Sequence, residues 1–242
     1  MTNTINTKQL LVMVFVPTIV FSSLYLLLGR FCHIPHLLLF CVLGTVVLVP
    51  MEIGMLLYAG KKETGVYSFG SVLRGQVKMP AWQVLIIVLA FVGIAGLLSA
   101  FVAPIENRIF ADARTALLNH LPIGFDWTNY EYLKSFSRPI LISTCLYYGI
   151  FNVLIGPITE ELYFRGYLTS HYKMQGTIKP VLITILFSLY HFWLPFNNIF
   201  RILAFLPVAY ISYKKKNISL SIYFHCGCNL FSTIAFTLAV LG

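Results

Sequence analysis

The chain has 242 residues, of which 58% are hydrophobic and only 10% carry a charge. Soluble globular domains carry about 25% charged residues, so this composition excludes a soluble domain and indicates a protein that lies largely in a lipid bilayer. The net charge of +9 does not indicate binding to nucleic acid. The basic residues lie in loops between apolar runs, where the lipid surface accounts for them.

Long apolar runs predict helices that cross the bilayer, because a span needs about 20 mainly apolar residues. In chain order the runs are 10–29, 34–60, 79–105, 139–159, 180–213 and 217–242. The first run is long and is followed by no small-residue cleavage site. We therefore expect a retained membrane anchor rather than a signal peptide.

The run 180–213 is too irregular for one helix, because Leu194-Pro195-Phe196-Asn197-Asn198 and Arg201 interrupt it. We expect two short helices of about 15 residues, each about 22 Å long. That length is less than the roughly 30 Å of the hydrocarbon core. The turn between them is therefore expected either to lie recessed within the protein or to sit in a thinned bilayer.

The connection between residues 105 and 139 predicts a helix that lies on the membrane surface. Hydrophobic residues recur in it at every fourth position, namely Ile105, Ile109, Ala113, Leu117 and Leu121. Trp127, Tyr130 and Tyr132 follow and are expected to anchor the segment at the interface. A plain interfacial helix is favoured here over a lid or an exosite.

The loop charges predict the orientation of the chain. With about seven spans, the side of the N-terminus collects eleven basic side chains, namely Lys8, Lys61, Lys62, Arg74, Lys78, Arg165, Lys173, Lys179, Lys214, Lys215 and Lys216. The other side collects six, namely Arg30, Arg108, Arg114, Lys134, Arg138 and Arg201. Because basic loops stay inside the cell, we expect a multi-pass cell-membrane protein with a cytoplasmic N-terminus.

Acidic residues within apolar runs are the strongest candidates for function, because ionisable groups are costly in hydrocarbon. We identify Glu52, Glu160 and Glu161 as such residues. If one helix continues to Arg165, then Glu161 and Arg165 share a face at the i,i+4 spacing and can pair. Glu160 points about 100° away and stays available for another task. The alternative is an ion pair that only pins two helices together.

Two histidines reach a similar depth to Glu160. In the expected topology Glu160 lies about one and a half turns inside the cytoplasmic end of its span. His225 lies ~12 Å and His191 ~16 Å along helices that enter from the same side. His225 and Asn229 share a helix face at the i,i+4 spacing. Each histidine alone could be a hydrogen-bonded packing residue, but the matched depth predicts a shared polar cavity.

A carboxylate with two imidazoles supports two kinds of hydrolysis. In one, Glu160 is a general base for water oriented by His191, while His225 and Asn229 donate to the oxyanion. In the other, Glu160, His191 and His225 bind zinc and leave one position for water. A serine nucleophile at Ser188 has no supporting pattern, and phosphate-binding glycine loops are absent from the sequence.

Three motifs, in this order on successive membrane segments, resemble those of the CAAX-protease and bacteriocin-processing family, which includes the type II prenyl-protein endopeptidases. They are Glu160-Glu161-x-x-x-Arg165, Phe187-x-x-x-His191 and His225-x-x-x-Asn229. The resemblance covers residues 139–240. It implies an intramembrane peptidase in which Glu160 and His191 activate water, His225 and Asn229 stabilise the oxyanion, and Glu161 and Arg165 support the site. It favours a mechanism without a cofactor, with zinc on Glu160, His191 and His225 as the alternative.

The expected fold is an all-α polytopic bundle of about seven transmembrane helices plus an interfacial helix. Residues 1–138 supply the N-terminal helices and the interfacial segment, residues 139–242 form the catalytic core, and the two make one integral domain. The expected partners are the lipid bilayer and a peptide or protein substrate, with no nucleic acid. The substrate class stays open between a prenylated C-terminus, a bacteriocin leader and a signalling-peptide precursor.

Two other classes of function stay open. One is a bacteriocin-immunity or scaffold protein that uses the same fold without catalysis. The other is a proton- or ion-coupled transporter, since buried carboxylates and histidines also build proton relays, although no internal repeat supports it. Glu52 has two interpretations. It either bonds into the cavity or pairs with a cation such as Arg165, or it is a locally satisfied carboxyl group.

Overall fold

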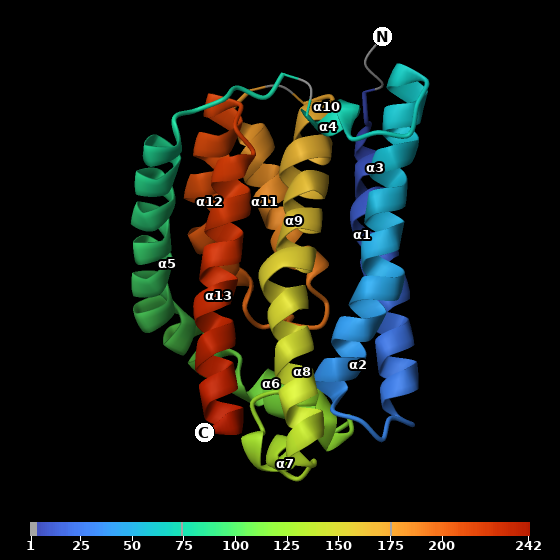
Figure 1. The fold of residues 1–242 in the computed structure, drawn as a ribbon, viewed down its shortest axis with the longest axis vertical. Helices are drawn as coiled ribbons and strands as arrows, with labels where there is room; N and C mark the ends of the chain where they lie inside the picture. Colours follow the sequence, from blue (N-terminus) through green and yellow to red (C-terminus); the bar gives the residue numbers. More distant parts are fainter. Residues whose placement is uncertain (1–3, 74, 175) are drawn as a thin grey trace.

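The computed structural model describes residues 4–73, 75–174 and 176–242. Arg74, one of the basic side chains counted above, lies outside the described residues. The described chain is almost entirely helical, and its helices run roughly parallel to one long axis (Figure 1). Apart from one isolated bridge between Ile5 and Tyr172, the described residues form no β-structure. The predicted all-α polytopic bundle is therefore confirmed.

Five helical stretches are long and apolar enough to cross a membrane. They are α1 (Thr7–Gly29), the stretch His36–Thr64, α5 (Ala81–Ile109), the stretch Arg138–His171, and α13 (Ser219–Leu241). The second stretch comprises α2 (His36–Leu43), η1 (Gly44–Leu48) and α3 (Val49–Thr64). The fourth comprises α8 (Arg138–Ile150), η3 (Phe151–Ile155), α9 (Gly156–Glu161), η4 (Leu162–Leu168) and α10 (Thr169–His171).

Wide π-helical turns interrupt the second and fourth stretches. Two of them, η1 and η3, are followed by a proline in the first turn of the next helix, Pro50 and Pro157. A proline inside a helix has no backbone N–H to donate, and its ring clashes with the carbonyl four residues earlier. A π turn widens the helix at that point and relieves the clash. Such turns occur often at functional sites, and here η3 and η4 flank the helix that ends with Glu160 and Glu161.

The predicted pair of short helices exists as α11 (Ile178–Tyr190) and α12 (Asn198–Lys215). The turn between them lies about midway along the bundle and not at its far end (Figure 1). Two contacts with the middle of α1 support this depth. Thr18 donates from its hydroxyl to the Tyr190 carbonyl at 2.5 Å, and Phe15 stacks on Phe192 with ring centroids 5.8 Å apart. The pair therefore enters and leaves on one side, and its turn lies at the level of the middle of α1.

The segment after α5 differs from the predicted surface helix. The structure breaks the fourfold repeat at Phe110, where α5 ends and α6 (Ala111–Leu118) begins. A single turn η2 (Ile123–Phe125) and the short α7 (Tyr130–Lys134) follow. Trp127 packs against the bundle. Its indole N–H donates to the Tyr25 hydroxyl at 2.9 Å, and its ring lies 4.6 Å from that of Phe40.

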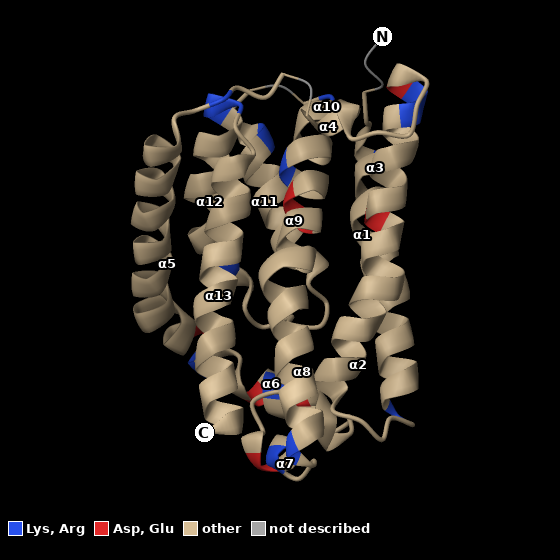
Figure 2. Cartoon of the chain, in the orientation of Figure 1, with Lys and Arg blue, Asp and Glu red and all other residues tan. Residues whose placement is uncertain are grey.

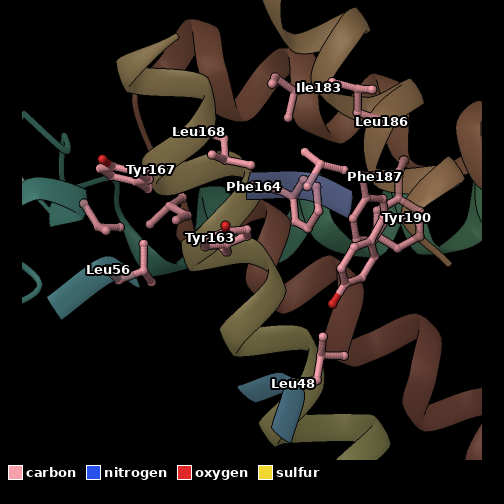
Figure 3. Packing of buried hydrophobic residues seen from close by; sticks show 14 of the residues in the cluster. Leu48, Leu56, Tyr163, Phe164, Tyr167, Leu168, Ile183, Leu186, Phe187 and Tyr190 are labelled. Carbon is pink, nitrogen blue, oxygen red and sulfur yellow. The ribbon is translucent and has the colours of Figure 1, made fainter. Parts of the chain in front are cut away.

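Charged residues gather at the two ends of the bundle, and few lie between them (Figure 2). The end that carries α4 (Gly70–Leu73) and α10 also carries the lysines near the ends of α3 and α12. Between the two ends the core combines leucine and isoleucine with large aromatic side chains (Figure 3). Phe164, Phe187 and Tyr190 meet with ring centroids 5.2 and 5.0 Å apart. This layer joins η4 to α11 just beside the two adjacent glutamates.

Candidate active site

Glu160 lies between two imidazoles that come from different parts of the chain. Its Oε1 is 4.0 Å from Nε2 of His191, and its Oε2 is 3.9 Å from Nε2 of His225. The three side chains are 12%, 10% and 6% exposed, respectively. Glu160 lies in α9, His191 directly follows the last residue of α11, and His225 lies in α13. The predicted meeting of three helices is thus present.

The far nitrogen of each ring fixes the direction in which the imidazole faces. Nδ1 of His191 lies 2.7 Å from the carbonyl of Phe187, one helical turn earlier. Nδ1 of His225 lies 3.0 Å from Oε1 of Glu161. A carbonyl or carboxylate oxygen can only accept, so a proton on each Nδ1 suits both contacts. Both Nε2 atoms are then left facing the Glu160 carboxylate.

Glu161 is a structural neighbour of this group and not a member of it. Its carboxylate is fully buried and lies 3.2 Å from Nη1 of Arg165, which confirms the predicted i,i+4 ion pair. The guanidinium of Arg165 also lies over the ring of Phe187, 3.9 Å from its centroid. One carboxylate therefore holds both Arg165 and the ring of His225, while the adjacent carboxylate faces the open space.

Asn229 also lines this space, and a hydrogen bond to a backbone carbonyl in the π turn η3, between α8 and α9, fixes its side chain. Its Nδ2 donates to the backbone carbonyl of Asn152 at 2.8 Å. In the π turn η3 the N–H of Gly156 bonds to the carbonyl five residues earlier. The next bond in that pattern would need an N–H at Pro157, which has none. The Asn152 carbonyl is therefore free to accept from Asn229, whose Nδ2 also lies 3.4 Å from Oδ1 of Asn152.

A cavity of about 620 Å³ lies against these groups and falls in the size range of ligand sites. Glu160, His191, His225 and Asn229 all line it. Much of the remaining wall is apolar and aromatic and includes side chains of α5 and α13. The structure thus brings together four of the predicted site residues around one space, with Glu161 and Arg165 packed behind them.

Glu52 does not pair with Arg165 in the structure. It is 1% exposed, and its Oε1 accepts a hydrogen bond of 2.5 Å from the hydroxyl of Tyr190. Tyr190 immediately precedes His191 in the chain. Glu52 is therefore a locally satisfied carboxyl group that helps hold the end of α11, in agreement with the plainer of its two interpretations.

Sequence reasoning missed two charged residues and one amide. Arg201 was counted as a loop charge on the far side, but it is 8% exposed and lines the cavity. Glu106 was not counted among acidic residues in apolar runs, yet it is 2% exposed. Asn152 is a single polar residue in an apolar run, and this pattern does not by itself indicate a functional role. The proline five residues later was the one signal that its carbonyl would be free.

The spacing of the donor atoms fits a water molecule better than a zinc ion. Zinc bonds to nitrogen and oxygen are 2.0–2.2 Å, which puts neighbouring ligand atoms roughly 3.3 Å apart in a tetrahedral site. The separations of 4.0 and 3.9 Å here are wider, whereas a bridging water accepts or donates across such gaps. Within the described ranges, no three His, Cys, Asp or Glu side chains are grouped to hold a metal ion.

Comparison with models of known protein families gives a match. The family model described as "Type II CAAX prenyl endopeptidase Rce1-like" matches residues 142–231. The matched stretch begins in α8, ends in α13, and contains Glu160, Glu161, Arg165, His191, His225 and Asn229. Searches of the curated proteins and of the solved structures found no match to this chain.

Proposed function

We propose that this chain, whose residues 142–231 match the model of the Rce1-like type II CAAX prenyl endopeptidases, hydrolyses a peptide bond of a membrane-associated protein or peptide. The observation that carries the proposal is the placement of one buried carboxylate between two imidazoles on the wall of a cavity. Its position within the bundle suits a substrate that is itself held at the membrane.

In the proposed reaction Glu160 is the general base. It removes a proton from a water that also bonds to Nε2 of His191, and the water oxygen attacks the carbonyl carbon of the peptide bond. The resulting oxyanion accepts from an N–H of the Asn229 amide, in place of its longer contact with Oδ1 of Asn152, and from Nε2 of His225. His225 carries a proton on both nitrogens in this step, with Glu161 facing Nδ1. Glu160 then gives its proton to the leaving amine as the C–N bond breaks.

Replacement of the base tests this proposal directly. Glu160→Gln keeps the shape of the side chain but cannot take a proton, so we expect cleavage to fall by roughly 10²–10⁴-fold. Cleavage by the His191→Ala variant should fall by a comparable factor, because the water loses its second contact. The assay uses purified protein in detergent and a pool of internally quenched apolar peptides. Thermal unfolding of each variant serves as the control for folding.

Turnover retained by both variants at the wild-type rate would rule the proposal out. The same assay addresses the catalytic water, for which we propose that no metal is needed, in line with the donor separations above. Activity should therefore persist in the presence of a zinc chelator. Loss of activity with the chelator, restored by added zinc, would instead assign Glu160, His191 and His225 as zinc ligands.

We also propose that the N-terminus lies in the cytoplasm. The bundle end where the chain begins carries the lysines near the ends of α3 and α12, and basic segments next to membrane spans stay on the cytoplasmic side. Glu160 lies on the α9–α10 side of its stretch, toward that same end. The site would therefore process substrates on the cytoplasmic half of the membrane.

A further inference from the structure

Arg201 is a buried cation on the cavity wall for which the proposed reaction has no use. It is 8% exposed and lines the same cavity as Glu160 and His191. An ionised side chain at this depth is costly unless an opposite charge pairs with it. The eight acidic residues are all within the described part of the chain. None of them has a carboxylate oxygen within 4.0 Å of the Arg201 guanidinium.

Glu106 reaches the same end of α12 but is bound elsewhere. Its two carboxylate oxygens accept from the backbone N–H groups of Ile199 and Phe200 at 2.8 and 2.7 Å. Both of its oxygens therefore satisfy the first turn of the helix. This carboxylate lowers the positive potential of the helix end, yet it makes no hydrogen bond to the guanidinium.

The bonds that Arg201 does make leave much of its donor capacity open. Nη1 donates to the carbonyl of Ser188 at 3.1 Å. Its other contacts, to the Ser188 hydroxyl, Asn198 and Leu194, are 3.4, 3.4 and 3.5 Å long. A guanidinium has five N–H donors in a planar fork that matches the two oxygens of a carboxylate. The guanidinium therefore keeps donors for an anion on the wall of the cavity that Glu160 and His191 also line.

We propose that Arg201 binds a carboxylate of the peptide substrate and so selects which peptides the cavity accepts. The proposal rests on the proposed peptidase function of that cavity. A peptide offers a carboxylate either at its C-terminus or on an Asp or Glu side chain, and either would form two parallel bonds to the guanidinium. Arg201 is then a specificity-determining residue that holds one end of the segment while Glu160 meets the bond to be cleaved.

Matched peptide pools test this assignment. One pool of internally quenched apolar octapeptides is made with a free C-terminal carboxylate, and a second pool is identical but ends in a carboxamide. A third ends in a carboxamide and carries one glutamate. The wild-type protein should cleave a pool with a carboxylate about tenfold faster or more than the neutral pool, because a charge-assisted bond contributes at least that factor. The first and third pools distinguish the two sources of the carboxylate.

Arg201→Gln should bring the ratio of the cleavage rate of a carboxylate pool to that of the neutral pool close to one. Arg201→Lys should retain part of the preference for the carboxylate. The ratio is the informative quantity, because loss of the Ser188 bond alone would lower both rates equally. Arg114→Gln is the matched control. Arg114 bonds to Asn107 and Asn197 near the same turn but does not line the cavity, so its replacement should leave the ratio unchanged.

Binding of fluorescently labelled pools, measured by anisotropy on Glu160→Gln, gives the same ratio without turnover. Equal rates and equal binding for the carboxylate and carboxamide pools with the wild-type protein would overturn the role of Arg201. So would a preference that survives Arg201→Gln. Cleavage of the carboxylate and carboxamide pools at the same rate would leave the peptidase proposal standing. Cleavage of none of the three pools would contradict the peptidase proposal, and the ratio of the binding affinities would then decide the role of Arg201.

Discussion

Two adjacent glutamates have opposite environments, and this gives them separable roles. Glu161 is fully buried and contacts both Arg165 and His225. Removal of one partner from a buried ion pair leaves the other charge without compensation, at a cost of about 3–5 kcal/mol. We expect Glu161→Ala to lower the free energy of unfolding by that amount. Unfolding in detergent, followed by circular dichroism, measures the effect.

Glu160→Ala is the matched control, one residue away on the same helix. Glu160 accepts no hydrogen bond from the described residues and faces the cavity, so its removal should change the free energy of unfolding by about 1 kcal/mol or less. Comparable losses in the two variants would contradict this division into a structural and a catalytic carboxylate.

At the level of residues, the sequence could predict those site members that stand out chemically. Glu160, His191 and His225 are ionisable groups within apolar runs, and the i,i+4 spacing of motif partners reports a shared helix face. Arg201 could not be predicted, because an arginine just after a Pro-Asn turn is typical of a surface loop. Only the recessed position of that turn, which depends on packing against α1, makes Arg201 a buried residue.

At the level of elements, Glu106 links α5, which forms part of the cavity wall, to the helix pair α11 and α12. Its carboxylate caps α12 through two backbone N–H groups, and α12 follows directly on the turn that begins with His191. Loss of a helix cap costs about 1–2 kcal/mol. Glu106→Ala should therefore lower the midpoint of thermal unfolding and weaken peptide cleavage together. Asp112→Ala, which removes an exposed carboxylate of α6, should change neither quantity.

The positions of helices followed from hydrophobic runs, but their irregularities did not. A π turn shifts the backbone bonds by one residue and leaves the hydrophobic pattern of a short segment almost unchanged, so η1, η3 and η4 could not be predicted. Pro50 and Pro157 were the local signals for two of them. The repeat from Ile105 to Leu121 suggested one surface helix, whereas the bundle places a break at Phe110 and turns Trp127 inward against Tyr25.

At the level of the whole molecule, the described residues form five helical stretches long and apolar enough to cross a membrane and one shorter pair, α11 and α12, and the two ends of the chain lie at opposite ends of the bundle (Figure 1). A chain with two further full spans in place of the pair would have the same termini, so these cannot distinguish the two arrangements. The position of the turn between α11 and α12 distinguishes the two arrangements. Phe192 in that turn is 42% exposed and stacks on Phe15 of α1, which places it near the middle of that helix.

Single cysteines in a background that lacks the five native ones therefore report the arrangement. A membrane-impermeant maleimide reacts with hydrated thiols only. Lys215→Cys should be labelled from the cytoplasmic side, and Asn119→Cys, an exposed position after α6, from the opposite side. Phe192→Cys should stay unlabelled from either side of sealed vesicles and become reactive only in denaturant. Prompt labelling of Phe192→Cys from the side that labels Asn119→Cys would mean that α11 and α12 cross the membrane fully. The recessed turn would then be wrong, and with it the depth assigned to Arg201.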